Sequence, residues 1–323
     1  MVVGGGGFIG SLLVRRLLDR GYNVTVVDNF WFGNYLPKNG RLTVKELDAL
    51  ELKPKDVEKV NSIIFIAGVS NDPMAEFSPQ VNFVENSAVP SYLAYILKQE
   101  SSYHKQKRFV YASSCSVYGY TKNKLMDETA KVAPQFPYGI SKLLGEKGVM
   151  DQESEYFRPI ALRKGTVGGW SNRMRFDLVV NTMTKFALTK GKISVHNPTL
   201  WRPIIDVRDV VEAYVRALES NLEITGVYNI SEGNYTVGRI ADIVKSTIEK
   251  ETGKTVELDI QDRPDMRNYK VSNNKAKLEL DFEAKYSPRD TVKSILENID
   301  YIGMFDFDDK KYSNIEMFKE LDL

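Results

Sequence analysis

The chain has 323 residues, enough to bury the core of one large domain or of two modest ones. Its 44 Lys and Arg residues nearly balance its 43 Asp and Glu residues, so no overall basic field attracts nucleic acid or an anionic membrane. One cysteine excludes an internal disulfide, two histidines leave no metal-binding cluster, and no apolar run is long enough to span a bilayer. We therefore expect a soluble, cytoplasmic protein that handles small molecules and holds no metal.

The first informative segment is glycine-rich. Residues 4–10 read GGGGFIG and lie between a short apolar run, residues 1–3, and an apolar helical repeat that ends near Gly21. This order predicts a strand, a tight turn and a helix. Two dinucleotide-binding spacings fit, GxGxxG from Gly5 and GxxGxxG from Gly4. Such a turn brings the backbone close to a pyrophosphate while the helix N-terminus faces its charge. The alternative reading, a flexible surface loop, has less support from these flanks.

An acidic residue follows at the position where a dinucleotide fold binds ribose. Asp28 comes directly after a strand-like run, residues 22–27, and its carboxylate could accept hydrogen bonds from the adenosine ribose hydroxyls. A phosphate on that ribose would meet like charge, and residues 29–33 contain no Lys or Arg to relieve it. Asp28 therefore favours NAD as the cofactor. The alternative is a solvated aspartate at a strand end.

The coarse pattern along the chain indicates an α/β protein. Strand-like runs alternate with helical patterns at residues 22–27, 62–67, 108–112 and 159–162. This alternation predicts a Rossmann-like, doubly wound parallel sheet. We expect an NAD-binding domain over residues 1–165 and a smaller mixed α/β lobe that binds substrate over residues 166–323. A strand and a helix within residues 203–220 are expected to return to the first domain.

Three reactive side chains are expected to meet at one edge of that sheet. Tyr138 and Lys142 are four residues apart, so they share a helical face. A surface helical pair is the alternative reading of this spacing. Residues 109–119 form an apolar strand that ends in hydroxyls, among them Ser114, at the edge where open parallel sheets bind ligands. A hydroxyl, a phenol and an ammonium can converge there.

Together these residues strongly resemble the extended short-chain dehydrogenase/reductase family, in particular its nucleotide-sugar epimerases and dehydratases. The resemblance covers nearly the whole chain. It implies Ser114, Tyr138 and Lys142 as the catalytic residues, with Tyr138 and Lys142 also touching NAD. The cofactor site that it implies contains, besides these two, Gly4, Gly7, Phe8, Ile9, Gly10, Asp28, Asn29, Asp48, Ala49, Ala67 and Gly68.

The family's mechanism implies that Lys142 and the positive nicotinamide lower the pKa of Tyr138, whose phenolate takes a proton from a sugar hydroxyl. Ser114 would hold the reacting oxygen. The implied partner is a nucleotide diphosphate sugar, whose phosphates call for arginines. The candidate substrate-binding residues are Ser114, Thr166, Arg175, Leu178, Arg202, Arg263 and Asp265. Thr166 departs from the family's asparagine, residues 262–265 resemble a shortened form of its arginine-to-aspartate signature, and each arginine could instead form a structural ion pair.

The reaction within the family is narrowed by the residues that follow Ser114. The 4,6-dehydratases typically carry Asp-Glu there, whereas this chain has Cys115 and Ser116, and neither replaces a carboxylate at neutral pH. Bifunctional epimerase-reductases typically place a cysteine at the position of Ser116. We expect Cys115 to be a buried structural thiol, with a deprotonating role as the alternative.

We therefore expect an NAD-dependent nucleotide-sugar 4-epimerase that acts through a transient ketone. A 4-dehydrogenase or 4-ketoreductase of a nucleotide-activated hexose, deoxyhexose or heptose is the second hypothesis, and a non-catalytic NAD-sensing or interaction protein is the third. The resemblance also implies a homodimer formed by helices around residues 84–99 and 138–150. His104 and His196 are interpreted as structural or surface residues. The nucleotide, the sugar and the stereocentre depend on loops of the second lobe.

Overall fold

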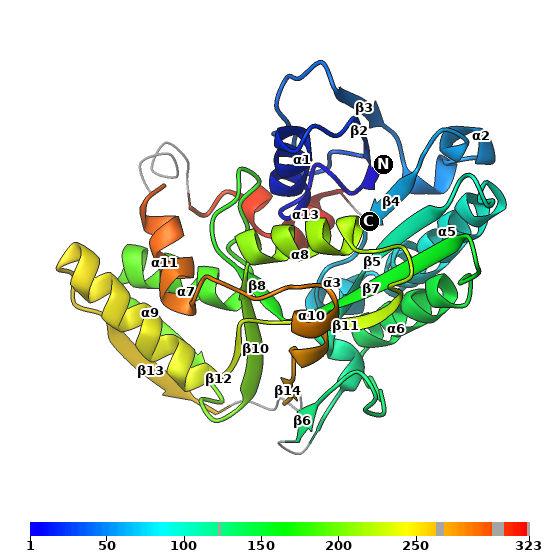
Figure 1. The fold of residues 1–323 in the computed structure, drawn as a ribbon. Helices are drawn as coiled ribbons and strands as arrows, with labels where there is room; N and C mark the ends of the chain where they lie inside the picture. The colour runs from blue at the N-terminus through cyan, green and yellow to red at the C-terminus, as the bar shows by residue number, and fades with distance from the viewer. Residues whose placement is uncertain (122–123, 263–267, 299–306, 322–323) are drawn as a thin grey trace.

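A computed structural model describes residues 1–121, 124–262, 268–298 and 307–321 of the chain. Within these residues a parallel sheet runs in the order β11–β7–β5–β4–β1–β2–β3 (Figure 1). Its strands are β1 (Val2–Val3), β2 (Val24–Asp28), β3 (Leu42–Glu46), β4 (Ser62–Phe65), β5 (Lys107–Ser114), β7 (Phe157–Lys164) and β11 (Gly226–Ile230). This order confirms the predicted Rossmann-like, doubly wound α/β fold.

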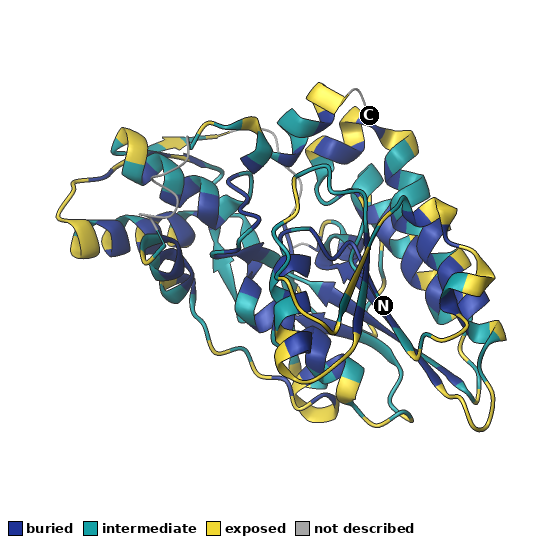
Figure 2. Ribbon diagram, turned by 90° about the horizontal axis from the view of Figure 1, so that it is seen from above, coloured by how far each residue is buried: buried dark blue, intermediate teal, exposed yellow. Residues whose placement is uncertain are grey.

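The sheet is buried on both faces because helices cover each of them. Along β5, Val110 and Ala112 point to one core, and Phe109 and Tyr111 to the other, as expected where side chains alternate between the faces of a strand. The first core is closed by α1 (Gly10–Asp19) and α8 (Val207–Glu219), and the second by α2 (Pro54–Val57), α5 (Val89–Gln99) and α6 (Pro137–Met150). Figure 2 shows the exposed residues of these helices on their outer sides.

The strand order reverses beside β1. From β1 the chain builds outward through β2 and β3, and then returns to place β4, β5 and β7 on the other side of β1. The loops that follow β1 and β4 therefore diverge and leave a crevice at the carboxyl ends of these strands, where ligands bind in folds of this type. Val3 is followed at once by the glycine turn, so the turn lies at the edge of this crevice.

A second layer of structure lies beside the crevice. The strands β8 (Thr166–Gly168), β10 (Trp201–Asp206) and β12 (Gly233–Thr236) form one small sheet, and β9 (Lys192–His196) pairs with β13 (Glu257–Gln261). Three helices, α7 (Val179–Lys190), α9 (Val237–Thr252) and α11 (Pro288–Leu296), pack around a separate apolar core with these strands (Figure 1). Because this layer has its own core, its loops can differ without disturbing the seven-stranded sheet.

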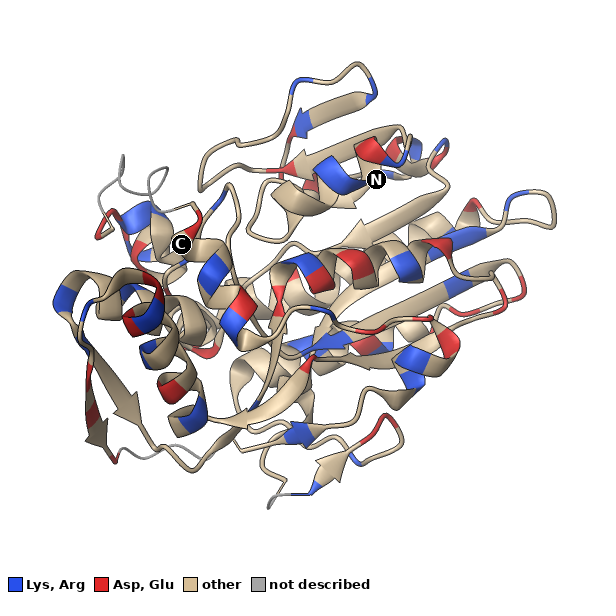
Figure 3. Cartoon of the chain, turned by 60° about the vertical axis from the view of Figure 1, so that its left-hand side comes forward, with Lys and Arg blue, Asp and Glu red and all other residues tan. Residues whose placement is uncertain are grey.

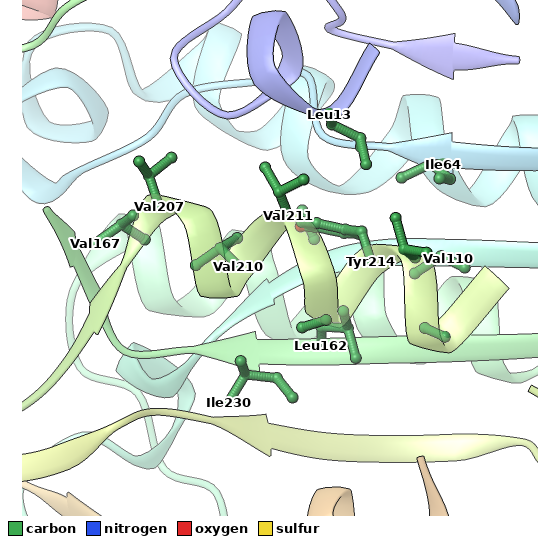
Figure 4. Close-up of a cluster of buried hydrophobic side chains, with 14 of the residues drawn as sticks. Leu13, Ile64, Val110, Leu162, Val167, Val207, Val210, Val211, Tyr214 and Ile230 are labelled. Atoms are coloured by element: carbon green, nitrogen blue, oxygen red, sulfur yellow. The ribbon is translucent and has the colours of Figure 1, made fainter. Parts of the chain in front are cut away.

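The segment 203–220 is divided between the two layers. Its helix α8 packs against the seven-stranded sheet, and Figure 4 shows Val211 and Tyr214 of this helix near Leu13, Ile64 and Val110. Its strand β10 instead pairs in parallel with β8 and antiparallel with β12. After α8 the chain adds β11 to the edge of the large sheet. The chain therefore crosses between the layers more than once.

The structure contains further short elements. They are α3 (Asp72–Phe77), α4 (Pro79–Phe83), a π-helical turn (Val84–Ala88), the pair β6 (Leu125–Met126) and β14 (Lys270–Val271), α10 (Asn274–Glu279), and α13 (Asn314–Leu321). The aromatic ring of Phe318 on α13 packs edge-on against Trp31, with 5.5 Å between ring centres. Basic and acidic residues are interspersed over the ribbon in Figure 3, in keeping with the net charge of +1.

Candidate active site

A cavity of about 620 Å³ lies at the carboxyl ends of β1, β2, β4 and β5, and its wall includes residues of the second layer. Every predicted site residue that the structure describes lines it, namely Gly4, Gly7, Phe8, Ile9, Gly10, Asp28, Asn29, Asp48, Ala49, Ala67, Gly68, Ser114, Tyr138, Lys142, Thr166, Arg175, Leu178 and Arg202. The other two predicted residues, Arg263 and Asp265, lie outside the described residues. The cavity therefore joins the predicted cofactor, catalytic and substrate residues in one space.

The glycine turn is shaped so that one position is left open to a ligand. Gly4 has a φ of +87°, which favours glycine, and a Cβ on Gly10 would lie 2.3 Å from the carbonyl oxygen of Gly4. A Cβ on Gly7 would meet nothing closer than 3.4 Å, although Gly7 lines the cavity. Two glycines thus allow the backbone to fold, and the third leaves space in front of the N-terminus of α1. An extended phosphate group fits this arrangement.

Asp28 closes the glycine turn from the end of β2. Its carboxylate accepts hydrogen bonds from the backbone N–H groups of Gly6 and Phe30, both at 2.8 Å. Burial raises the pKa of Asp28, and the two backbone hydrogen bonds act in the opposite direction. The carboxylate oxygens keep further acceptor capacity toward the cavity, which suits a pair of ribose hydroxyls.

The opposite wall at this end of the cavity is formed by residues after β3 and β4. Asp48 accepts a hydrogen bond from Leu50 N–H at 2.8 Å and so begins a short helical turn that contains Ala49. Gly68 has a φ of +113°, and a Cβ there would lie 2.3 Å from Oδ1 of Asn86. Asn86 was not predicted from the sequence, although it fastens the β4 turn to α6 by donating to Val69 O and Ser141 Oγ.

The three predicted catalytic residues meet at the middle of the cavity. Ser114 ends β5, and Tyr138 and Lys142 lie one turn apart near the start of α6. The ammonium nitrogen of Lys142 lies 5.9 Å from the ring centre of Tyr138 and 5.4 Å from that of Tyr111. The Ser114 hydroxyl donates to Ser116 Oγ at 3.2 Å, and it lies close enough to the Tyr138 hydroxyl to act to lower the pKa of that phenol. A hydroxyl and a phenol therefore face the same point of the cavity, as an acid–base pair acting on an alcohol requires.

Burial dominates the electrostatics of Tyr138 and Lys142. Burial raises the pKa of Tyr138, whereas the Ser114 hydroxyl and, more weakly, Arg175 act to lower it. Burial also lowers the pKa of Lys142 well below its usual value, and the nearby cation Lys164 adds to this effect. Desolvation dominates both groups, and the expected lowering of the Tyr138 pKa by Lys142 together with the nicotinamide stays a prediction.

Beneath this group lies a buried network that the sequence did not reveal. Glu146, one further turn along α6, accepts hydrogen bonds from Arg163 Nε at 2.9 Å and from Ser113 Oγ at 2.6 Å. Arg163 also donates to the hydroxyl of Tyr118 at 2.9 Å. These contacts connect α6 to β5 and β7, so they fix the helix that carries Tyr138.

Cys115 is buried in this arrangement, as expected. It is 1% exposed, and its thiol donates to the carbonyl oxygen of Arg163 at 3.1 Å. Burial raises the pKa of the thiol to about 12. The thiolate is the reactive form of cysteine, so Cys115 is not suited to proton transfer at neutral pH. Ser116, the next residue, lines the cavity instead.

The second layer contributes its predicted residues to the wall of the cavity. Arg175 is occupied within the protein, since Nε and Nη2 each lie 2.8 Å from the carboxylate of Asp177. The guanidinium of Arg202 lies 5.9 Å from the ring centre of Tyr269, which also lines the cavity. Thr166 is on β8, and Leu178 immediately precedes α7.

Two further cavity residues were not predicted to be functional. His196, for which the sequence indicates a structural or surface role, lines the cavity, and its buried Nδ1 has no hydrogen-bond partner among the described residues. Lys164 donates to Ser113 O at 2.9 Å, and burial lowers its pKa to about 8. Neither lies in a recognisable motif, and only the ends of β9 and β7 bring them to the site.

No group of three or more His, Cys, Asp or Glu side chains that could hold a metal ion occurs in the described parts of the chain. Nor is any helix described here both long and apolar enough to cross a membrane.

Comparisons with known proteins agree with this geometry. A model of the NAD-dependent epimerase/dehydratase family matches residues 1–231. The chain is 28% identical to UDP-glucose 4-epimerase 3 of Oryza sativa subsp. japonica, covering 91% of this chain and 87% of that protein. It is also 28% identical to UDP-glucose 4-epimerase of Bacillus subtilis strain 168, covering 88% and 92%. Its structure is similar to that of MoeE5 in complex with UDP-glucuronic acid and NAD, with a TM-score of 0.80, 25% identity and coverage of 93% and 98%.

Proposed function

The chain belongs to the NAD-dependent epimerase/dehydratase family, and from this premise we propose that it is a nucleotide-sugar 4-epimerase that works through a transient 4-keto sugar. The observation that carries the proposal is the meeting of Ser114 and Tyr138 in a cavity that also contains the glycine turn. Oxidation and reduction of one sugar alcohol require this combination of an acid–base group and a dinucleotide.

The cofactor of this family is NAD, and the residues of the cavity fit it. The space in front of Gly7 would take the pyrophosphate, and the carboxylate of Asp28 would take the adenosine ribose hydroxyls. Asp48 and Ala49 would contact the adenine, while Ala67 and Gly68 would lie beside the cofactor. When bound, NAD supplies a hydride acceptor and donor at the sugar carbon together with a positive charge near Tyr138.

The protein's own residues transfer the proton and bind the reacting oxygen of the sugar. Tyr138, as phenolate, takes the proton from the sugar C4 hydroxyl and later returns it. Ser114 holds the same oxygen through its hydroxyl, so the developing charge meets a prepared donor. Lys142 faces the ring of Tyr138 from the next turn of α6. Epimerisation also requires the keto sugar to present its other face to the cofactor.

The residues beside Ser114 favour epimerisation over dehydration. Elimination of water needs a second acid and base, which carboxylates usually supply. Cys115 is buried with a pKa of about 12, and Ser116 carries no ionisable group at neutral pH. The two curated relatives described above are both named 4-epimerases, which supports the same choice.

We propose a nucleotide diphosphate sugar as the substrate, in keeping with the UDP-sugars named for the relatives. Thr166 and Ser114 would contact the sugar, and Leu178 and Arg202 would contact the nucleotide. Arg175 would act through its ion pair with Asp177, which shapes the wall of the cavity. Arg263 and Asp265 remain candidates from the sequence.

The test is to incubate purified protein with UDP-, GDP-, CDP- and dTDP-sugars in deuterated water and to follow both epimers by NMR. The proposal expects one class of nucleotide sugar to give its C4 epimer with bound NAD and without solvent deuterium on the sugar carbons. Turnover only with added NADH would assign a 4-ketoreductase instead. Deuterium in the sugar would indicate enolisation, and hence dehydratase or 3,5-epimerase chemistry.

We also propose that the protein acts in the cytoplasm as a homodimer. Its single cysteine is free and buried, which suits a reducing compartment. The helices α5 and α6 expose Tyr92, Tyr95 and Leu144, at 41%, 52% and 48%, and these side chains would be covered if the two helices packed against a second copy. Light scattering should show a dimer that Leu144→Asp dissociates, whereas Leu278→Asp, at a residue 83% exposed on α10, should leave it intact.

A further inference from the structure

Arg173 lies in the wall of the cavity, on the segment that connects β8 to α7. Its side chain is 2% exposed, and its guanidinium carbon lies 3.8 Å from the ring centre of Phe32. Its Nη2 donates to Oδ1 of Asn314, the first residue of α13, at 2.6 Å. The guanidinium is therefore held in place by an aromatic ring on one side and an amide on another.

This buried cation is only partly satisfied by the protein. Its Nε and Nη1 are buried and have no hydrogen-bond partner among the described residues. Asp177, the acidic residue closest to it in sequence, is already bound by Arg175 through two hydrogen bonds. A buried guanidinium with two unused donors is costly unless an anion completes it.

Contacts of its segment place Arg173 near the glycine turn. Ser171, two residues earlier, donates to the carbonyl oxygen of Phe8 at 2.6 Å, which places this segment against the glycine turn. The negative charge of the Asp28 carboxylate, at the end of β2, acts to raise the pKa of the guanidinium. The segment that carries Arg173 therefore lies beside the glycine turn, and Arg173 lines the same cavity as Gly7 and Asp28.

The glycine turn itself carries no cationic side chain. Residues 4–10 contain no Lys or Arg, and a helix N-terminus offers only about half of one positive charge. A dinucleotide pyrophosphate carries two negative charges, so backbone N–H groups alone leave most of that charge uncompensated. Buried charges of this kind are normally paired.

We propose that Arg173 binds the pyrophosphate of the dinucleotide through Nε and Nη1, with Asn314 as its positioning residue. The inference rests on the proposed cofactor site and adds to it a ligand from the second layer of the structure. Burial, followed by the neighbouring Arg175, lowers the pKa of Arg173 to about 9, which still leaves the side chain charged at neutral pH. A bound phosphate would restore the pKa and offset the cost of burial.

Calorimetric titration of the intact protein with ADP-ribose, adenosine and UDP tests the inference without measuring turnover. Arg173→Met keeps the apolar stem and removes the charge, and Arg173→Lys keeps the charge but loses the guanidinium. The control is Arg239→Gln, which removes an exposed arginine at the start of α9. We expect Arg173→Met to weaken the binding of ADP-ribose roughly tenfold to a hundredfold and Arg173→Lys to weaken it less. Both variants should bind adenosine and UDP as tightly as the parent protein.

Urea unfolding without ligand separates a binding role from a structural one. Because the charge is incompletely paired, Arg173→Met should unfold at the same or a higher urea concentration than the parent protein. A loss of stability with unchanged ADP-ribose affinity would overturn the proposal, as would a loss of affinity for UDP alone. Failure of the parent protein to bind ADP-ribose would refute the cofactor site itself. If Arg173→Met does not fold, the ADP-ribose affinity of the Arg173→Lys variant tests the proposal instead.

Discussion

The carboxylate of Glu146 and the guanidinium of Arg163 form a buried ion pair, with 2.6 Å between Oε1 and Nη2 and exposures of 4% and 5%. Glu146 follows Tyr138 and Lys142 at intervals of four residues, so all three lie on one face of α6. The face that presents the phenol to the cavity is thus the face that is anchored to β7. The ion pair sets the depth and rotation of the catalytic helix.

Glu146→Gln should therefore lower the free energy of unfolding by about 3 to 5 kcal/mol, because it leaves the buried charge of Arg163 without its counterion. Urea denaturation measures this loss. Glu283→Gln is the matched control, since Glu283 is 70% exposed in its ion pair with Lys277, and it should change stability by about 0.5 kcal/mol or less. An equal effect of the two substitutions would contradict the anchoring role of Glu146.

The parts of this site that the sequence predicts are those encoded by short segments. The glycine turn lies within seven residues, and Tyr138 and Lys142 within one helical turn, so their spacing predicts them once the flanking strand and helix patterns are added. The alternation of strands and helices likewise predicts the parallel sheet, whose strand order confirms it. The assignment of individual residues to cofactor or substrate stays a prediction.

The parts that the sequence could not reveal depend on distant contacts. The charge of Asp28 acts on Arg173 although the two positions are 145 residues apart in sequence. Asn314, which accepts a hydrogen bond from Arg173, comes near the end of the chain. His196 reaches the cavity because β9 pairs with β13, a pairing without a local signal. Similarly, the division of residues 203–220 between two layers follows from the partners of β10 and α8, not from their own patterns.

The value of kcat/KM should rise toward alkaline pH. In the proposed mechanism the phenolate of Tyr138 is the active form, and burial raises the pKa of Tyr138, so the ionised fraction grows as pH increases through and above neutrality. Ser114→Ala removes the hydroxyl that acts to lower this pKa, and so it should move the rising limb of kcat/KM to higher pH as well as slow the reaction. The profile of kcat/KM against pH checks both effects.

Ser101→Ala is the control for this profile, because Ser101 lies beyond the end of α5 and its hydroxyl bonds only to Lys98 O among the contacts described. Its pH profile should match that of the parent protein. A Ser114→Ala variant that is slower but keeps an unshifted limb would show that Ser114 contacts the substrate without tuning Tyr138.

Cys115 should be unreactive in the folded protein. With a pKa of about 12 and a buried sulfur, almost none of the thiol is ionised near neutral pH, and reagents cannot reach it. Thiol titration should therefore detect no rapid reaction in native buffer and one thiol per chain in denaturant. Cys115→Ala should keep kcat nearly unchanged. Rapid native labelling, or a large loss of kcat in this variant, would restore the alternative of a catalytic cysteine.

Single Gly→Ala substitutions in the glycine turn should distinguish an effect on folding from an effect on cofactor binding. Gly7→Ala adds a Cβ that meets nothing closer than 3.4 Å in the protein, so the unliganded protein should keep its stability. The same methyl group enters the cavity in front of α1, and NAD should bind about tenfold or more weakly. Calorimetry with NAD and urea unfolding measure the two quantities on one preparation.

Gly10→Ala should behave differently, because its Cβ would lie 2.3 Å from the Gly4 carbonyl oxygen and 2.7 Å from the backbone of Gly5. The backbone must shift to relieve this contact, so this variant should lose both stability and NAD binding. Gly40→Ala, where a Cβ meets nothing within 4 Å, should change neither. If Gly7→Ala binds NAD as tightly as the parent protein, the pyrophosphate does not occupy the space in front of Gly7, and the cofactor must be placed elsewhere in the cavity.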